Sequence, residues 1–171
     1  MQTQRLLLRR YQPEDLEDFT ALVSDPEVVR FEPYGPMTSD EARAALQQRI
    51  TDDAFIAVER RSDGRMIGNV YLGRRDFGAL ELGYLFRRDC WGQGYARESC
   101  EAVIEAAFAA GVHRIFAECD PNNAASWRLL ERLSFAREGH LRQNIYFHTD
   151  SDDRPIWKDT FLYARLSPNQ A

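Results

Sequence analysis

The sequence predicts an α/β (α+β) fold in one domain, with a mixed, mostly antiparallel sheet of about seven strands and about four flanking helices. Three observations favour this fold. Short strand-like segments are interrupted by segments whose apolar residues recur at helical spacing. No internal repeat and no Pro- or Gly-rich linker divides residues 1–171. A chain of 171 residues is long enough for one domain with its own hydrophobic core.

The N-terminal half is expected to contain one strand, two helices and then three strands. The first strand is "RLLLRRY", residues 5–11. Pro13 and the acidic Glu14 then favour a helix start, because proline suits a first turn and acidic groups suit the positive helix end. Thr38 and Glu41 form a capping box for a second helix through residue 50. Strands follow at 55–60, 66–72 and 80–86, the first two joined by the hairpin turn "RSDG".

The C-terminal half is expected to alternate helices with strands and to end in a strand pair. A helix from about residue 94 to 110 is indicated by apolar spacing and by Gly111 just after its end. A strand at 114–119, a short helix at 123–133, and strands at 135–149 and 156–166 complete the chain. The unit from Leu80 to Cys119 is strand–helix–strand, which predicts parallel strands with a right-handed crossover.

Composition argues against several classes of protein. The net charge of −5 disfavours a general nucleic-acid binder. No apolar run suits a signal peptide or a membrane span. Three cysteines without CxxC spacing indicate free thiols in a reducing compartment, and the three scattered histidines make no metal signature. We therefore expect a cytoplasmic protein without metal, nucleic acid or membrane as partner.

The segment Trp91-Gly92-Gln93-Gly94 stands between a predicted strand and a predicted helix. The first amides of a helix have no partners within the helix and carry the positive end of its dipole. Two glycines allow a ligand to reach this main chain, so the turn suits a phosphate or pyrophosphate. A tight turn with solvated amides remains the alternative. The P-loop lysine is missing, and Arg97 stands where a dinucleotide fingerprint requires its third glycine.

The stretch "YLFRRDCWGQGYARES" resembles the acetyl-coenzyme A loop of the GNAT N-acetyltransferases, whose pattern is [QR]-x-x-G-x-[GA]. Gly94 and Ala96 match its two small positions, while Trp91 replaces the usual Gln or Arg. Trp91 and the segments "TQRLLLRRYQPEDLEDF", "ECDPNNAASWRLLERLSFAREGHL" and "WKDTFLYARL" are similar to the RimJ/RimL-type branch, the ribosomal-protein N-terminal acetyltransferases. The resemblance implies a GNAT fold with one parallel strand pair at the cofactor cleft.

The resemblance further implies that acetyl-coenzyme A is the cosubstrate. Main-chain amides from about Gly92 to Arg97 would hold its pyrophosphate, a run that includes Gln93, Gly94, Tyr95 and Ala96. Backbone at Leu85 and Phe86 would pair with the pantetheine arm like an added strand. The guanidinium of Arg87 could meet a coenzyme phosphate or lie in a solvated turn.

Asn123 and Ser126 match the family's Asn-x-x-Ser, and both residue types are also ordinary at a helix start. The resemblance implies that Asn123 bonds the pantetheine amides and that Ser126 donates to the leaving thiolate. The amide of Tyr84 would donate to the thioester oxygen as negative charge develops there. For the general base, Glu118 is the first candidate, since some relatives carry a base five residues before this Asn; Glu81 is the second.

The acceptor is expected to be a primary amine, either a protein N-terminus or a small molecule, and a homodimer is left open. Phe31, Tyr34 and Trp157 are candidates to line the acceptor side. A covalent route through Cys119 is disfavoured because a cysteine in an apolar strand is usually inert, whereas Cys90 is expected to form a thiolate more readily. A coenzyme-binding sensor without efficient catalysis and a nucleotide-phosphate binder remain rival interpretations.

Overall fold

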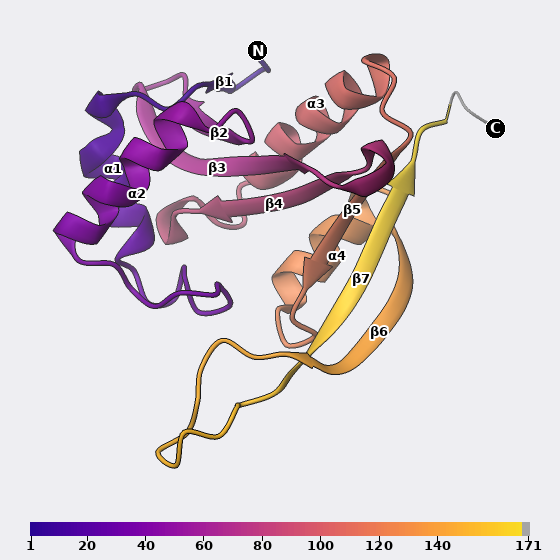
Figure 1. Ribbon diagram of the computed structural model, residues 1–171. Helices are drawn as coiled ribbons and strands as arrows, with labels where there is room; N and C mark the ends of the chain where they lie inside the picture. The colour runs from indigo at the N-terminus through magenta and orange to yellow at the C-terminus, as the bar shows by residue number, and fades with distance from the viewer. Residues whose placement is uncertain (169–171) are drawn as a thin grey trace.

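The computed structural model describes residues 1–168, which form one seven-stranded sheet covered by helices (Figure 1). Its strand order is β1-β2-β3-β4-β5-β7-β6, and every neighbouring pair is antiparallel except the parallel pair β4–β5. The predicted fold class, with its single parallel pair, is confirmed. The strands are β1 (Leu6–Arg9), β2 (Phe55–Arg60), β3 (Arg65–Arg74), β4 (Leu80–Phe86), β5 (Arg114–Cys119), β6 (Ala136–Ile145) and β7 (Lys158–Leu166).

Four α-helices cover the two faces of the sheet (Figure 1). They are α1 (Leu16–Val23), α2 (Ser39–Thr51), α3 (Tyr95–Ala109) and α4 (Ala124–Arg132). Buried residues of α1 and α2 form one core with side chains of β2 and β3, and those of α3 and α4 form a second core with β4 and β5. The sheet therefore separates two hydrophobic layers. Short 3₁₀ turns lie at Pro13–Asp15, Asp76–Gly78 and Arg88–Cys90.

The helix ends follow the predicted capping chemistry. The amide of Thr38 donates to Glu41 Oε2 at 2.8 Å, and Thr38 Oγ1 accepts from the amide of Glu41, which completes the capping box of α2. Gly111 has φ +90° just beyond α3, a left-handed conformation that ends the helix.

The last strand pair is shorter than the sequence suggests. We expected strands at 135–149 and 156–166, but their pairing stops where Ile145 lies opposite Lys158. Beyond this point, strand pairing of the β6–β7 arm within residues 1–168 is reduced to an isolated bridge between Thr149 and Pro155, and Asp150 Oδ1 accepts two turn amides. Apolar residues near the arm are exposed instead of packed, so apolar character alone misplaced both strand ends.

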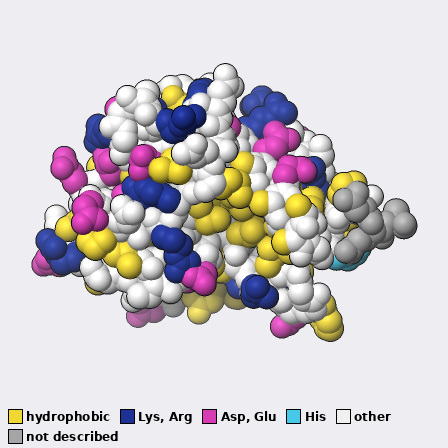
Figure 2. Space-filling model, turned by 90° about the horizontal axis from the view of Figure 1, so that it is seen from above, with side chains coloured by type: hydrophobic (Ala, Val, Ile, Leu, Met, Phe, Trp, Pro, Cys, Tyr) yellow, Lys and Arg dark blue, Asp and Glu magenta, His cyan; other side chains and the backbone are white. Residues whose placement is uncertain are grey.

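The surface carries mixed charges. In Figure 2, basic and acidic side chains are interspersed on the visible face, and hydrophobic side chains gather in a hollow at its middle. Among residues 1–168, no helix is both long and apolar enough to cross a membrane. The same part of the chain holds no group of three His, Cys, Asp or Glu side chains arranged to bind a metal ion.

Candidate active site

The parallel strands β4 and β5 form a fork at the centre of the sheet. They pair at their N-terminal ends, where Leu80 lies opposite Ile115 and Glu81 opposite Phe116. No later pair of residues joins these two strands in the described chain, and Figure 1 shows them diverging toward their C-terminal ends. The fork therefore leaves two strand edges open in the middle of the sheet, and such edges can pair with an extended ligand.

The hydrogen-bond pattern between β3 and β4 determines which peptide groups of β4 face the fork. The amide of Arg87 donates to the carbonyl oxygen of Ile67 on β3 at 2.9 Å. Since bonded pairs alternate along an antiparallel ladder, Leu85 also bonds toward β3, whereas Tyr84 and Phe86 face the fork. The side chain of Leu85 packs in the α1–α2 core. The expected pairing of Leu85 with a pantetheine arm is therefore not supported by its geometry.

Trp91 forms a hydrogen bond with one of the peptide groups that face the fork. Its indole N–H donates to the carbonyl oxygen of Phe86 at 2.8 Å, while 49% of the side chain stays exposed. This bond anchors the turn that follows β4. It leaves the amide of Phe86, and both the amide and the carbonyl of Tyr84, directed into the fork.

The turn between β4 and α3 presents a run of amides. Within residues 1–168, no protein acceptor is bonded to the backbone N–H of any residue from 92 to 97; the first amide that bonds back is that of Glu98, to the carbonyl of Gly94 at 3.0 Å. Gly92 and Gly94 have φ of +72° and +81°. Gly94 is the N-cap of α3, so the positive end of the helix dipole lies behind these amides.

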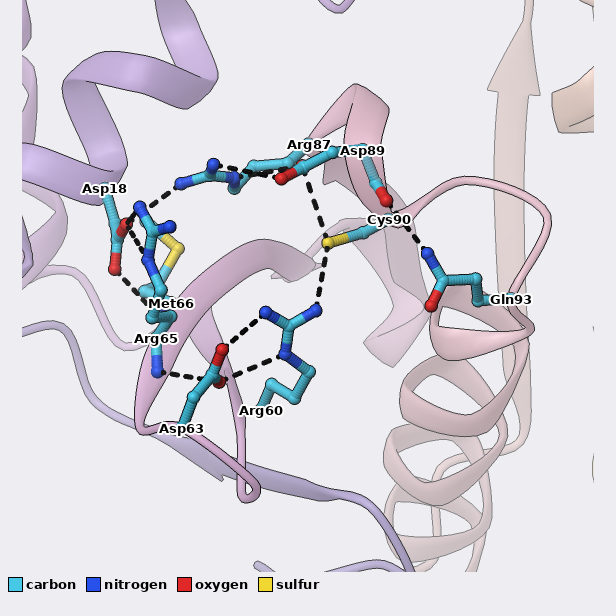
Figure 3. Close-up of polar contacts among 9 residues, drawn as sticks. All are labelled: Asp18, Arg60, Asp63, Arg65, Met66, Arg87, Asp89, Cys90 and Gln93. Carbon is cyan, nitrogen blue, oxygen red and sulfur yellow. Dashed lines mark hydrogen bonds and ion pairs between the residues drawn. The ribbon is translucent and has the colours of Figure 1, made fainter.

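Polar contacts hold this turn in place, and Figure 3 shows the one between Gln93 and Asp89. The side chain of Gln93 donates to the carbonyl oxygen of Asp89 at 2.8 Å, and the carbonyl of Gln93 accepts from Arg5 Nη1 at 2.9 Å. Arg5 also stacks over the Tyr95 ring, 4.5 Å from its centroid. The main chain of this turn is thus held by the side chains of Gln93 and Arg5.

Arg87 does not lie free beside the turn. Its guanidinium bonds Asp18 of α1 at 2.9 Å and Asp89 at 3.1 Å, and only 15% of the side chain is exposed (Figure 3). Two carboxylates already neutralise this cation. The expectation that Arg87 meets a coenzyme phosphate is therefore not supported, and its contacts instead tie α1 to the end of β4.

Asn123 and Ser126 lie at the start of α4. Asn123 is the N-cap, and its Oδ1 accepts from the amide of Ser126 at 3.1 Å. The hydroxyl of Ser126 lies 2.9 Å from the hydroxyl of Tyr84 on β4. It also contacts Cys119 of β5: burial raises the pKa of the Cys119 thiol to about 11, and the Ser126 hydrogen bond opposes that rise. Ser126 is thus placed between the two arms of the fork, on the face covered by α3 and α4.

Glu118 and Glu81 lie on the opposite face of the sheet. Partial burial and the charge of Glu81 raise the pKa of Glu118, and the nearby Arg75 opposes this rise. Glu81 itself is paired with Arg75. A raised pKa brings a carboxylate closer to the range useful for accepting protons. Glu118 is the freer of the two carboxylates, since no hydrogen bond to its side chain is recorded in the described chain.

A shallow pocket opens beside Glu118. Loop 24–38 and the β6–β7 arm flank the end of β5 (Figure 1), and together they line it with Phe31, Glu118, Cys119, Asp120, Ile145, Phe147, Lys158, Asp159 and Thr160. Of the aromatics expected on the acceptor side, Phe31 lines this pocket. Tyr34 packs against the α1–α2 core, and Trp157 is exposed against Tyr146. Sequence reasoning missed Phe147, because it had no signal that strand pairing ends at Ile145.

The cysteines are poor nucleophiles. Cys90 is 3% exposed, and burial followed by the charge of Asp89 raises the pKa of its thiol despite Arg60 and Arg87 nearby (Figure 3). Burial therefore disfavours the thiolate form at both cysteines, and the expectation that Cys90 forms it more readily than Cys119 stays a prediction. Cys119 is also buried with a raised pKa, which disfavours a covalent route through its thiol.

Comparisons with known proteins agree with this geometry. A family model described as an acetyltransferase (GNAT) domain matches residues 5–136. The N-acetyltransferase p20 of Bacillus licheniformis is 33% identical over 150 residues, which cover 82% of this chain and 84% of the relative. A solved acetyltransferase of the GNAT family from Bacillus anthracis has a TM-score of 0.89 and 25% identity, with 98% of both chains covered.

The fold is also that of RimL, an α-N-protein acetyltransferase of ribosomal L7/L12 solved in complex with coenzyme A. That structure has a TM-score of 0.80 and 21% identity, covering 96% of this chain and 95% of RimL. At this identity the likeness concerns the fold. With the family model matched over most of the chain and the fork and amide run in place, the chain belongs to the GNAT family of N-acetyltransferases.

Proposed function

We propose that this N-acetyltransferase holds acetyl-coenzyme A across the fork between β4 and β5 and transfers the acetyl group to a primary amine. The observation that carries the proposal is the amide run of residues 92–97 at the open end of the fork. These N–H groups fit the pyrophosphate, and two left-handed glycines give it access to the main chain. The fork-facing amide of Phe86 and carbonyl of Tyr84 fit the pantetheine arm as an added strand.

The proposed reaction uses groups on both faces of the sheet. The amine approaches from the pocket beside Glu118, and its nitrogen bonds to the acetyl carbon while the carbon–sulfur bond breaks. Glu118 accepts the proton that the amine loses, and the amide of Tyr84 donates to the carbonyl oxygen as charge develops. The electron pair of the broken bond remains on sulfur, next to Ser126 on the other face. A thioester in the fork is therefore reached by the amine from one face and by Ser126 from the other.

The acceptor pocket favours a cationic amine. Asp120, Asp159 and Glu118 contribute carboxylates to its wall, and Lys158, 3.4 Å from Asp120, offsets one of them. Phe31 and Phe147 add aromatic surface. We place a protein N-terminus first among acceptors, on the likeness to RimL, and a small amine second.

Replacing Glu118 with Gln tests the role of the base. General-base catalysis contributes about 10²–10⁴-fold, so kcat should fall by that order with the best amine of a panel of N-terminal peptides and polyamines. The carboxylate is the active form and its pKa is raised, so wild-type kcat should decline as pH falls through a midpoint above the ordinary Glu value. Glu118→Gln should lose that acidic limb.

Coenzyme A affinity separates catalysis from folding in this test. It should be unchanged in Glu118→Gln. Glu105→Gln should retain full rate, because the exposed carboxylate of Glu105 bonds Arg165 away from the fork. An unchanged rate in Glu118→Gln removes this residue as the base. A wild-type chain that binds coenzyme A but acetylates no amine would favour the sensor interpretation.

A further inference from the structure

The side chain of Tyr84 reaches across the fork to a residue 42 positions later in the chain. Its hydroxyl lies 2.9 Å from Ser126 Oγ and 3.1 Å from the carbonyl oxygen of Ser126. Its ring packs against the core on the α3–α4 face. A phenylalanine would fill the same space, so the hydroxyl is the part of this side chain that packing alone does not explain.

The two hydroxyl groups allow two hydrogen-bond arrangements, because each has one proton and can also accept. In one, Tyr84 donates to the Ser126 carbonyl and Ser126 Oγ donates to Tyr84. In the other, Tyr84 donates to Ser126 Oγ, and the Ser126 proton is free to point elsewhere. Negative charge beside Ser126 favours the second arrangement, since charge-assisted hydrogen bonds are the stronger ones.

We propose that Tyr84 is a positioning residue for acetyl transfer: by donating to Ser126 Oγ, its hydroxyl aims the Ser126 proton at the leaving sulfur. The inference rests on the proposed function, which puts the coenzyme sulfur next to Ser126. No proton crosses Tyr84. The carbon–sulfur bond breaks, and its electron pair stays on sulfur. The hydrogen bond from Ser126 stabilises that negative charge. Tyr84 strengthens the Ser126 hydrogen bond by donating to Ser126 Oγ.

The surroundings keep Tyr84 a donor throughout. Burial raises the pKa of its phenol, and the hydrogen bond with Ser126 opposes that rise only in part. The other groups near it are the thiols of Cys100 and Cys119, both buried with raised pKa values. Within residues 1–168, no carboxylate or cation shifts the pKa of this phenol, so the two hydroxyl groups lie among neutral groups until the thiolate forms.

The test measures the pKa of the thiol of bound coenzyme A, which requires no acceptor. Thiolate absorbance near 240 nm is followed against pH for the protein with coenzyme A, minus the protein with desulfo-coenzyme A, which cancels the protein's own cysteines. Wild type should lower the thiol pKa relative to free coenzyme A. Tyr84→Phe should raise it by about half to one unit, the effect of losing one hydrogen bond.

A double substitution distinguishes positioning from a structural role. Ser126→Ala should raise the thiol pKa at least as far as Tyr84→Phe, and Tyr84→Phe should add nothing in the Ser126→Ala background. Tyr163→Phe is the matched control, because it removes a hydroxyl from another buried tyrosine, 3.1 Å from Glu131. That variant should leave the thiol pKa unchanged.

Each remaining outcome decides between the inference and the proposed function. If Tyr84→Phe binds coenzyme A with the wild-type thiol pKa, or shifts it equally with and without Ser126, the positioning role is overturned. If wild type fails to bind coenzyme A at all, the proposed function falls, and this inference falls with it. With a working acceptor, Tyr84→Phe should lower kcat and leave KM for the amine unchanged.

Discussion

At the scale of single residues, the glycines of the amide run show a requirement of the backbone. Gly92 has φ +72°, and a Cβ built on it would meet no heavy atom within 4 Å. Space is therefore not the constraint at this position. The constraint is the left-handed backbone conformation, which costs a residue with a Cβ roughly 1–2 kcal/mol. The same conformation directs the neighbouring amides outward.

Gly92→Ala should weaken coenzyme A binding by an order of magnitude or more, because a relaxed backbone turns the amides away. Gly64→Ala is its matched control: Gly64 has φ +71° and equally open space, but it lies in the β2–β3 hairpin turn. Both variants should lose similar stability on urea denaturation, and only Gly92→Ala should lose affinity in calorimetry. Equal affinities in the two variants would contradict a phosphate-binding role for the run.

At the scale of elements, one carboxylate joins α3 to the segment that precedes β1. Glu98 accepts from Thr3 Oγ1 at 2.5 Å, from the amide of Arg5 at 2.9 Å and from Arg5 Nε at 2.7 Å. Burial raises the pKa of Glu98, but these hydrogen bonds outweigh it and lower the pKa overall. Since Arg5 also donates to the carbonyl oxygen of Gln93, the segment before β1 supports the amide run through this contact.

Glu98→Gln should lower the free energy of unfolding at pH 7 by about 1–3 kcal/mol, the usual effect of a hydrogen-bonded charge. A carboxylate with a lowered folded pKa stabilises the fold above its unfolded pKa and loses that effect as pH falls through the folded pKa. The deficit should therefore shrink below about pH 4. Glu101→Gln, at an exposed neighbour on α3, should cost little. A pH-independent deficit would contradict the ionic origin.

At the scale of the whole molecule, the proposed ligand would bridge both arms of the fork. Coenzyme A at about 100 times its dissociation constant should add roughly 2.7 kcal/mol to the free energy of unfolding. For a chain of this size the melting temperature should rise by several degrees, with acetyl-coenzyme A as well. ATP and NAD at equal concentration should produce smaller shifts in the same thermal assay. An equal shift with ATP would favour the nucleotide-phosphate interpretation.

Much of the fold could be predicted because local patterns specify it. The bounds of β2, β4 and β5 agree with the expected 55–60, 80–86 and 114–119, since each apolar run ends at turn residues. The contacts of the site residues were harder to predict from the sequence. Leu85 faces β3, the Phe86 carbonyl bonds Trp91, and Arg87 pairs with Asp18, 69 residues earlier in the chain. A motif identifies a loop but does not show which of its groups are already bonded within the protein.

By itself, the sequence determined the succession of strands and helices, the glycine turn and the family resemblance, because these depend on residues close together in the chain. Only the tertiary structure decided that β4 and β5 diverge, that Ser126 and Glu118 lie on opposite faces of the fork, and that the Tyr84 hydroxyl meets Ser126. Those facts depend on ladder register and on side chains packed across tens of residues, and a local pattern carries no information about either.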